Sequence, residues 1–401
     1  MTRRLMDGFP PRPETQVTLA NWRTSPFNRW AFHHVREILP SADIAHDPAN
    51  VRELPLTPTA LDGLRISGVD GEALTLRQAL EATSTDGLVV LHKGAIALEY
   101  YANGMTARSP HILMSVSKSM LGLLAGILAD RGVLDLSRLV TDIIPEVKAT
   151  AWAGATVGQL LDMRVGLAFD EDYLATSGAI VTYRKSTGWN PLEPGETPSD
   201  LRSFFREVKE RDGPHGGRFA YISPNTDLLG WIIERVSGQR YADLMSELLW
   251  QRIGAVDSAY ITVDRLGAPR AAGGMCTTTR DLARIGQMMV EGGTHRGRQV
   301  VPEAWIETIT HDGDSEAWDK GTLVTYFPGI PMHYRAKWYV ERTAPPLLLA
   351  LGIHGQNLFV DPRNAVVVAK LSCQAEPLNA ELIALTRRLV SELRRTLATT
   401  T

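Results

Sequence analysis

The sequence predicts an α+β fold: an antiparallel sheet flanked by helices, with an inserted, mainly helical domain. Strand-like runs lie toward both ends of the chain, and helical patterns fill its middle. At 401 residues the chain is long for one core, which favours two domains or one domain with a large insertion. We expect residues 1–150 and 270–401 to form a discontinuous sheet domain, and residues 151–269 to form the helical insertion with active-site loops.

The first half of the chain supplies a pair of strands and a buried helix. Two apolar runs, Gly87–His92 and Ala95–Tyr101, predict neighbouring strands. The residues after Lys118 are apolar on nearly all sides, which is typical of a helix buried at the centre of a protein. Residues 1–27 are rich in Pro and Arg and are expected to wrap the surface.

The second half combines further helices with late strands. Gly, Pro, Asp, Thr and Ser are abundant over 165–215, which predicts mainly loops, and helical patterns dominate from Leu201 to Ile253. Other helices in the chain are predicted at Leu76–Thr83, Thr156–Met163, Thr279–Glu291, Glu303–Ile309 and Leu378–Thr396. Late strands are predicted at Tyr334–Val340, Leu347–Leu351, Leu358–Val360 and Ala365–Leu371.

Composition and charge argue against several functional classes. The 42 basic and 45 acidic residues are well mixed and leave a net charge of −3, without the basic patch that nucleic-acid binding needs. No run of about 18 apolar residues could span a membrane, and the N-terminus lacks the apolar segment of a secretory signal. We therefore expect a cytoplasmic protein with neither a nucleic-acid nor a membrane partner.

Ser115-x-x-Lys118 is the first candidate for chemistry. This spacing puts both side chains on one helix face, about 5–6 Å apart at Cβ. A serine becomes a good nucleophile when a neighbouring base takes its proton, and burial lowers the pKa of a lysine toward that of a useful base. The alternative is a helix-capping serine followed by a solvated lysine, which the apolar residues beyond Lys118 disfavour.

Two further segments could complete such a site. Tyr221 lies just before a helix that begins near Pro224, where it could carry a proton or simply be a buried aromatic residue. The glycines around His354 allow a substrate to approach the backbone, whose N–H groups could form an oxyanion hole. His354 itself could equally be a structural histidine. No residue spacing suits a metal or a phosphate loop, so no cofactor is expected.

In this order, Ser115-x-x-Lys118, Tyr221-x-Ser and His354-Gly355 resemble the serine β-lactamase and penicillin-binding-protein superfamily. From about residue 21 to about residue 372 the sequence is similar to the 6-aminohexanoate-dimer hydrolases, the nylon-oligomer hydrolases of the β-lactamase fold. The segments that carry this resemblance are Asn28–His33, Leu113–Ser119, Glu171–Tyr173, Asn225–Asp227, Thr279–Arg284 and Gly352–Leu358.

The resemblance implies a role for each matching position. Ser115 is similar to the nucleophile, Lys118 to its base, and Tyr221 to the residue that passes a proton to the leaving group. The backbone N–H groups of Ser115 and Ile353 resemble the oxyanion hole, and Tyr173 resembles a tyrosine on a loop that closes over the substrate. The remaining positions implied to bind substrate are Arg184, Trp189, Ala272, Trp338 and His354. The resemblance implies no metal or cofactor and suggests a homodimer.

Departures from the family's pattern bear on the substrate. The more active 6-aminohexanoate-dimer hydrolases carry an acidic residue where Arg184 stands and an amide side chain where Ala272 stands. An acid suits the ammonium end of the dimer, whereas an arginine repels it. His354 replaces the cationic residue that holds an antibiotic carboxylate in related enzymes, which disfavours penicillin chemistry.

The resemblance thus implies a serine hydrolase of linear amides, such as the 6-aminohexanoate dimer, and of short-chain esters. One alternative is a carboxylesterase of the same fold with little amidase activity. Another is a non-catalytic binding or sensor module, which would accumulate a stable acyl adduct on Ser115. Tyr221 and Tyr173 favour turnover, because a sensor has no use for a leaving-group proton donor.

Overall fold

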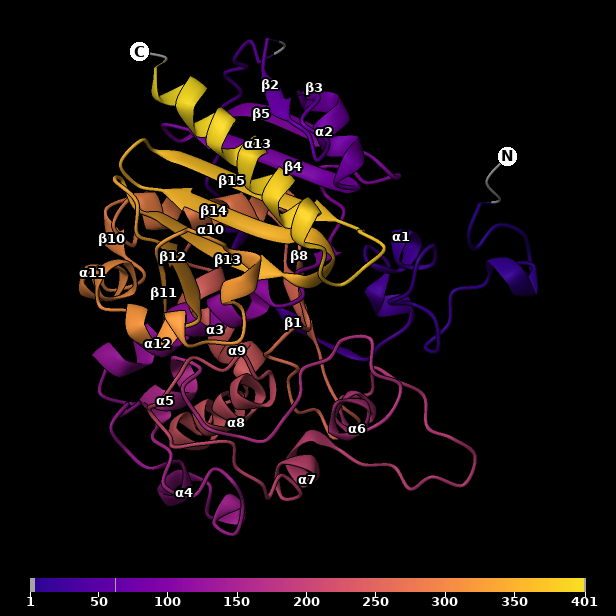
Figure 1. Ribbon diagram of the computed structural model, residues 1–401, viewed down its shortest axis with the longest axis vertical. Coiled ribbons are helices and arrows are strands. Elements are labelled where there is room, and N and C mark those ends of the chain that lie inside the picture. The colour runs from indigo at the N-terminus through magenta and orange to yellow at the C-terminus, as the bar shows by residue number, and fades with distance from the viewer. Residues whose placement is uncertain (1–3, 62, 400–401) are drawn as a thin grey trace.

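The computed structural model describes residues 4–61 and 63–399, and it confirms the α+β fold. Its centre is an antiparallel sheet with the strand order β11-β12-β13-β14-β15-β4-β5 (Figure 1). The pairing of β15 with β4 joins the late strands to the early pair. The strands are β4 (Thr85–His92), β5 (Ala95–Tyr101), β11 (Met332–Arg335), β12 (Trp338–Glu341), β13 (Leu347–Gly352), β14 (Gln356–Asp361) and β15 (Val366–Ser372).

Each face of this sheet carries its own apolar layer. Successive side chains of a strand point to opposite faces, so Val366 and Val368 of β15 join the apolar cluster of α13 (Ala380–Ala398). Val367 and Ala369 join the cluster of α3 (Val116–Asp130) and α10 (Thr279–Val290) on the other face. Figure 1 shows α13 crossing in front of the sheet. Beside α13 lie α2 (Leu76–Ala82), β2 (Arg65–Ser67) and β3 (Ala73–Thr75).

Helix α3 is the buried central helix that the sequence predicts, and residues Val116–Leu128 are all buried. Gly122 allows the sheet to approach it closely, because an added Cβ would lie 2.0 Å from the carbonyl oxygen of Ala336. The Ser119 hydroxyl donates a hydrogen bond of 2.7 Å to the carbonyl oxygen of Lys337. These contacts fix the start of α3 relative to the sheet.

A helical layer lies on the far side of α3, in the lower half of Figure 1. Its central member is α8 (Pro224–Ser237), which contacts α3. The other helices of this layer are α4 (Val140–Ile143), α5 (Val157–Leu161), α6 (Ala179–Ser186), α7 (Leu201–Phe205) and α9 (Tyr241–Met245). The structure also has the helices α1 (Asn28–Ala31), α11 (Glu303–His311) and α12 (Ser315–Asp319) and the strands β9 (Thr294–His295) and β10 (Arg298–Gln299).

A second, four-stranded sheet leads the chain into α3. Its order is β1 (Ser41–Ile44), β7 (Ala259–Thr262), β8 (Met275–Thr277) and β6 (His111–Ile112). The sequence does not predict this sheet, whose strands are too short for a clear pattern. The division into residues 1–150 with 270–401 and residues 151–269 stays a prediction, although β7 of the insertion pairs with β1 and β8 of the other part.

One local expectation needs correction. The predicted strand Tyr334–Val340 is a hairpin, because Ala336 and Lys337 have φ angles of 48° and 69° and turn the chain between β11 and β12. The region 165–215 is mainly loop, as predicted, with α6 and α7 inside it. Other expectations are confirmed, among them β4, β5 and the capped helices α2 and α5.

The described residues contain no helix that is both long enough and apolar enough to cross a membrane.

Candidate active site

Ser115 lies where the four-stranded sheet passes into α3. The chain leaves β6 at Ile112, the N–H of Leu113 donates to the Met275 carbonyl oxygen, and Met114 adopts a φ of 46°. A positive φ is uncommon for a residue with a side chain, and such outliers concentrate at functional sites. The turn places Ser115 at the N-cap of α3 with 9% of its surface exposed.

The Lys118 amine is buried against Ser115. Its Nζ lies 2.9 Å from Ser115 Oγ, 3.0 Å from Ser223 Oγ and 2.7 Å from the Ala272 carbonyl oxygen. Burial lowers the pKa of Lys118 to about 7; Glu171 opposes this shift and Arg270 adds to it. A neutral amine has two N–H donors and one lone pair. It can therefore donate to Ser223 and Ala272 while it accepts the proton of Ser115.

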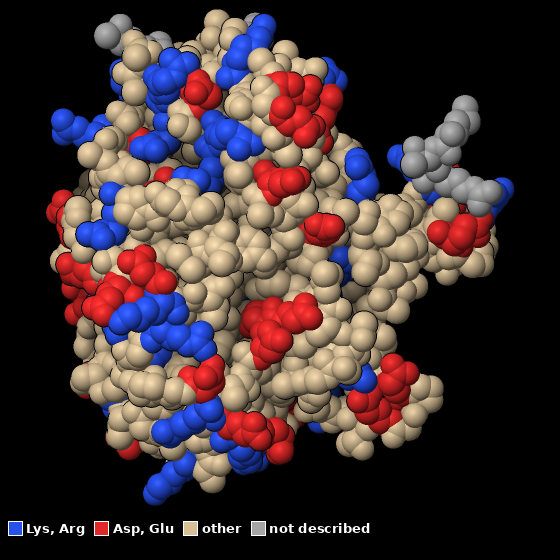
Figure 2. All heavy atoms as spheres, viewed as in Figure 1, with Lys and Arg blue, Asp and Glu red and all other residues tan. Residues whose placement is uncertain are grey.

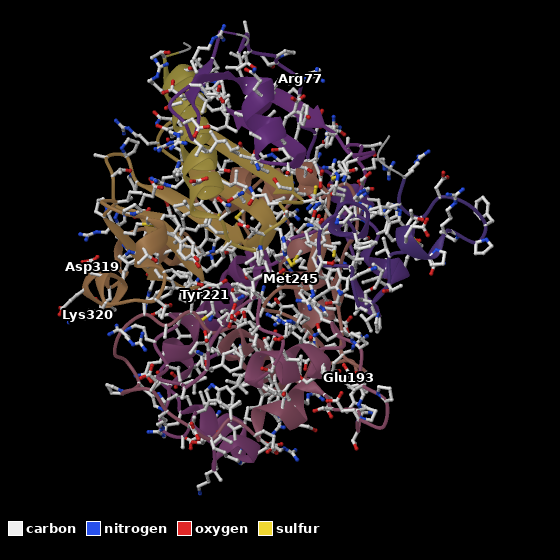
Figure 3. The ribbon with its side chains drawn as sticks, turned by 45° about the vertical axis from the view of Figure 1, so that its right-hand side comes forward. Arg77, Glu193, Tyr221, Met245, Asp319 and Lys320 are labelled. Carbon is white, nitrogen blue, oxygen red and sulfur yellow. The ribbon has the colours of Figure 1, made fainter. Side chains whose placement is uncertain are left out.

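Tyr221 lies beside this pair, between the sheet and the helical layer (Figure 3). Its ring centroid is 4.8 Å from Lys118 Nζ, close enough for a cation–π contact when the amine is protonated. Burial raises the pKa of the phenol, while hydrogen bonding to Ser115 and Tyr339 acts in the other direction. The hydroxyl therefore stays protonated near neutral pH and can donate a proton.

The backbone around Ser115 and Ile353 can form an oxyanion hole. An added Cβ on Gly352 would lie 2.7 Å from the Leu113 carbonyl oxygen and 3.0 Å from the Ser115 nitrogen, so the end of β13 lies directly against Ser115. Ser115 starts α3, and Ile353 starts the single turn Ile353–Gly355. The first N–H groups of a helical turn have no partner within it, so both can point at a ligand.

Glu171 is a site residue whose role the sequence does not reveal. Its carboxylate accepts hydrogen bonds from the backbone N–H of Ser223, at 2.7 Å, and from the Ser223 hydroxyl. It also accepts from the Tyr173 hydroxyl at 3.3 Å. Glu171 thereby ties the loop of Tyr173 to the start of α8 and orients Ser223 toward Lys118. Glu171 lies in one of the segments that carry the resemblance, but the contact with Ser223 arises only in the folded chain.

Asp227 positions the third partner of Lys118. It is fully buried on α8, forms an ion pair with Arg270, and accepts hydrogen bonds from the Tyr183 hydroxyl and, at 2.7 Å, the Ala272 N–H. The Ala272 carbonyl oxygen, on the other side of the same residue, is the one that contacts Lys118. Ala272 thus contributes its backbone to the site.

Two pockets meet at Ser115, and Tyr173 and Ile353 line both. We call the first the apolar pocket; it lies between β13, β14 and α13 and is lined by Tyr221, Phe327, Tyr339, Leu349, Leu351 and Leu382. We call the second the arginine pocket; it is lined by Arg23, Glu171, Arg184, Trp189, Arg270 and Ala272. Figure 2 shows a hollow near the middle of the molecule with acidic side chains beside it.

Two predicted substrate-binding residues lie elsewhere. The indole of Trp338 is fully buried among the apolar residues around α3, because alternation along β12 turns the next residue, Tyr339, toward the apolar pocket. His354 is buried against Phe32, and its Nδ1 lies 2.7 Å from the Gln374 carbonyl oxygen. Burial lowers the pKa of His354 to about 4, so the ring is neutral and suits the structural role.

Among the described residues, no group of three or more His, Cys, Asp or Glu side chains could hold a metal ion.

Comparison with known proteins agrees with the fold. Residues 70–391 match the beta-lactamase family. A 6-aminohexanoate-dimer hydrolase from Paenarthrobacter ureafaciens is 37% identical over 370 residues, which are 92% of this chain and 91% of that protein. A Bacillus anthracis structure, provisionally described as a 6-aminohexanoate-dimer hydrolase, is 27% identical with a TM-score of 0.87, over 96% of this chain and 98% of that one.

A family VIII carboxylesterase, 16% identical with a TM-score of 0.56 over 77% of this chain and 96% of its own, shares the fold alone. Fold and family together define a hydrolase of the serine β-lactamase class. Within that class, the chain belongs to the family of 6-aminohexanoate-dimer hydrolases, as the sequence resemblance implied.

The lowered pKa of Lys118 predicts a pH dependence. Only the neutral amine can accept the Ser115 proton, so kcat/KM for a neutral ester should rise with pH through about 7 and then level off. The raised pKa of Tyr221 keeps its proton in place over the same range. A pH–rate profile of the intact protein measures this, and a rate that is flat from about pH 5 to about pH 9 would contradict it.

Substituting Glu171 with Gln should alter both rate and pH profile. The Glu171 carboxylate raises the pKa of Lys118, so Glu171→Gln should move the acid limb of kcat/KM to lower pH. The rate should fall as well, because the two hydrogen bonds from Ser223 end on different oxygens of Glu171, and a Gln amide has only one oxygen. Glu193→Gln is the matched control, since Glu193 is exposed in a loop far from Tyr221 (Figure 3). An unshifted acid limb in Glu171→Gln would refute this positioning role.

Proposed function

We propose that this protein is a serine hydrolase that cleaves linear amides and short-chain carboxyl esters through an acyl-enzyme on Ser115. The contact between the buried Lys118 amine and the Ser115 hydroxyl, at 2.9 Å, carries the proposal. The relative from Paenarthrobacter ureafaciens is named as a 6-aminohexanoate-dimer hydrolase, and we extend that activity to this chain.

Acylation begins with transfer of the Ser115 hydroxyl proton to Lys118 Nζ, while Ser115 Oγ attacks the substrate carbonyl carbon. The N–H groups of Ser115 and Ile353 stabilise the negative charge that develops on the carbonyl oxygen. Tyr221 then donates its hydroxyl proton to the departing nitrogen or oxygen and regains a proton from the Lys118 ammonium beside its ring. The bond to the leaving group breaks, and the acyl group stays on Ser115.

Deacylation repeats these steps with water as the nucleophile. The water passes a proton through the Tyr221 hydroxyl to Lys118 while its oxygen attacks the acyl carbon. The Ser115 oxygen then leaves with a proton returned from Lys118, which restores the free enzyme. Tyr173 lines both pockets and Trp189 lines the arginine pocket, so we assign both to substrate binding.

A carboxylesterase with little amidase activity is the second candidate, and Arg184 favours it. Arg184 is buried in the arginine pocket, where it would repel the ammonium group of the 6-aminohexanoate dimer. Esters depend less on Tyr221, because an alcohol is a better leaving group than an amine. Both candidates use the same acyl-enzyme.

Kinetics on two substrates test the proposal. We expect turnover of a short-chain nitrophenyl ester and slower turnover of the 6-aminohexanoate dimer, with both rates reduced by roughly a thousandfold or more in Ser115→Ala. Mass spectrometry of the protein mixed with ester should show an acyl group on Ser115 that disappears within the assay. An adduct that persists would identify a sensor, and equal rates for parent and Ser115→Ala would exclude the serine mechanism.

We also propose that the protein assembles as a homodimer. Residues 4–16 extend from the body of the molecule as an arm (Figures 1 and 2), and Phe9 on this arm is fully exposed. A large apolar side chain in that position is expected to pack against a second copy. Light scattering should give the mass of two chains, and of one chain after removal of residues 1–16. The mass of one chain for the intact protein would refute the proposal.

A further inference from the structure

Three arginines converge in the arginine pocket. Arg23 comes from the N-terminal segment, Arg184 from α6, and Arg270 from the turn between β7 and β8. The ring of Trp189 contacts two of them, with the guanidinium carbons of Arg23 and Arg270 at 5.8 Å and 5.0 Å from its centroid. All of these residues line the same pocket beside Ser115.

Two carboxylates offset part of this positive charge. Asp227 pairs with Arg270 and accepts from the Ala272 N–H, and Glu171 accepts both hydrogen bonds of Ser223 while its charge still acts on Arg184 and Arg270. The carboxylate of Asp172 is exposed and accepts the Leu174 N–H. Arg184 instead donates to the carbonyl oxygens of Ala175 and Asp172 at 3.0 Å, and Arg23 donates to the Asn190 amide oxygen. Arg184 and Arg23 therefore donate their hydrogen bonds to neutral acceptors and not to carboxylates.

The pocket retains excess positive charge. The Nε atoms of Arg23 and Arg270 are buried without a hydrogen-bond partner among the residues that the structure describes. Burial lowers the pKa of Arg23 to about 9, and repulsion from Arg184 and Arg270 adds to this shift. Buried cations are costly, and an anion bound among them would offset part of that cost.

The proposed role of Tyr221 as proton donor indicates which part of a substrate reaches this pocket. Tyr221 lines the apolar pocket, so the group that receives its proton departs on that side. The acyl chain attached to the carbonyl carbon then extends the other way, past Trp189 into the arginine pocket. The leaving group meets mainly apolar and aromatic side chains, since the one arginine that lines this pocket, Arg387, is paired with Glu341, whereas the acyl chain meets three arginines.

We propose that the preferred substrates carry a carboxylate on the acyl side, as half-esters and half-amides of aliphatic dicarboxylic acids with an apolar leaving group. This inference rests on the proposed serine hydrolase. The acyl carboxylate binds between Arg23, Arg184 and Arg270 and orients the carbonyl group toward Ser115. An acyl chain that ends in an ammonium group is disfavoured by the same charges.

Three nitrophenyl esters with the same number of methylene groups test this charge preference. They are the hemi-adipate, which ends in a carboxylate, the hexanoate, which ends in a methyl group, and the 5-aminopentanoate, which ends in an ammonium. We expect kcat/KM to fall in that order by about tenfold at each step. In Arg184→Gln and in Arg23→Gln, the advantage of the hemi-adipate over the hexanoate should shrink to about threefold or less.

Arg77→Gln is the matched control, because Arg77 lies on α2 with 81% of its side chain exposed and far from Tyr221 (Figure 3). It should leave the tenfold order unchanged. Inhibition of the parent protein provides a measurement that needs no variant: adipate should compete with the hexanoate ester more strongly than hexanoate itself does.

The outcomes separate this inference from the proposed function. Equal kcat/KM for the three esters, or adipate no better than hexanoate as an inhibitor, would overturn the carboxylate preference and leave the hydrolase standing. Absence of Ser115-dependent turnover for all three esters would overturn the proposed function itself.

Discussion

The site depends on one buried amine that has no carboxylate in direct contact. Lys118 is held by Ser115, Ser223 and the Ala272 carbonyl oxygen, and this neutral environment lowers its pKa to about 7. A carboxylate in direct contact would keep the amine charged and useless as a base. Three parts of the fold meet to arrange this: the start of α3, the start of α8 and the turn before β8. The close packing of α3 between the sheet and the helical layer keeps water away.

Two carboxylates lie near the Lys118 amine, and each is separated from it by one neutral residue. Glu171 reaches Lys118 through the Ser223 hydroxyl, and Asp227 reaches it through the Ala272 backbone. The carboxylates orient Ser223 and Ala272, and they do not cancel the lowering of the Lys118 pKa that burial causes. The two pockets that meet at Ser115 differ in their lining, because Glu171 and Arg270 line the arginine pocket and Tyr221 lines the apolar pocket. We propose that charge orients a substrate at one end and apolar contact at the other.

The sequence reveals the parts of this arrangement that depend on local patterns. Apolar residues on all sides identify α3, and alternating or continuous apolar runs identify β4, β5 and β13–β15. The Ser115-x-x-Lys118 spacing predicts a nucleophile and its base. Contacts between distant segments are not visible in it. Arg23, Glu171 and Arg270 come together only in the folded chain, and the turn at Ala336 and Lys337 decides that Tyr339 rather than Trp338 faces the pocket. His354 shows the same limit, because its burial against Phe32 is a tertiary effect.

Direct titration of the Lys118 amine tests the central claim most sharply. Carbon-13 labelling at the lysine Cε atoms, with Lys118→Arg to assign the signal, allows the pKa to be measured by NMR in the resting protein. We predict a value of about 7. A value near the ordinary lysine pKa of about 10.4 would mean that Lys118 is charged at neutral pH, and would contradict its role as the base.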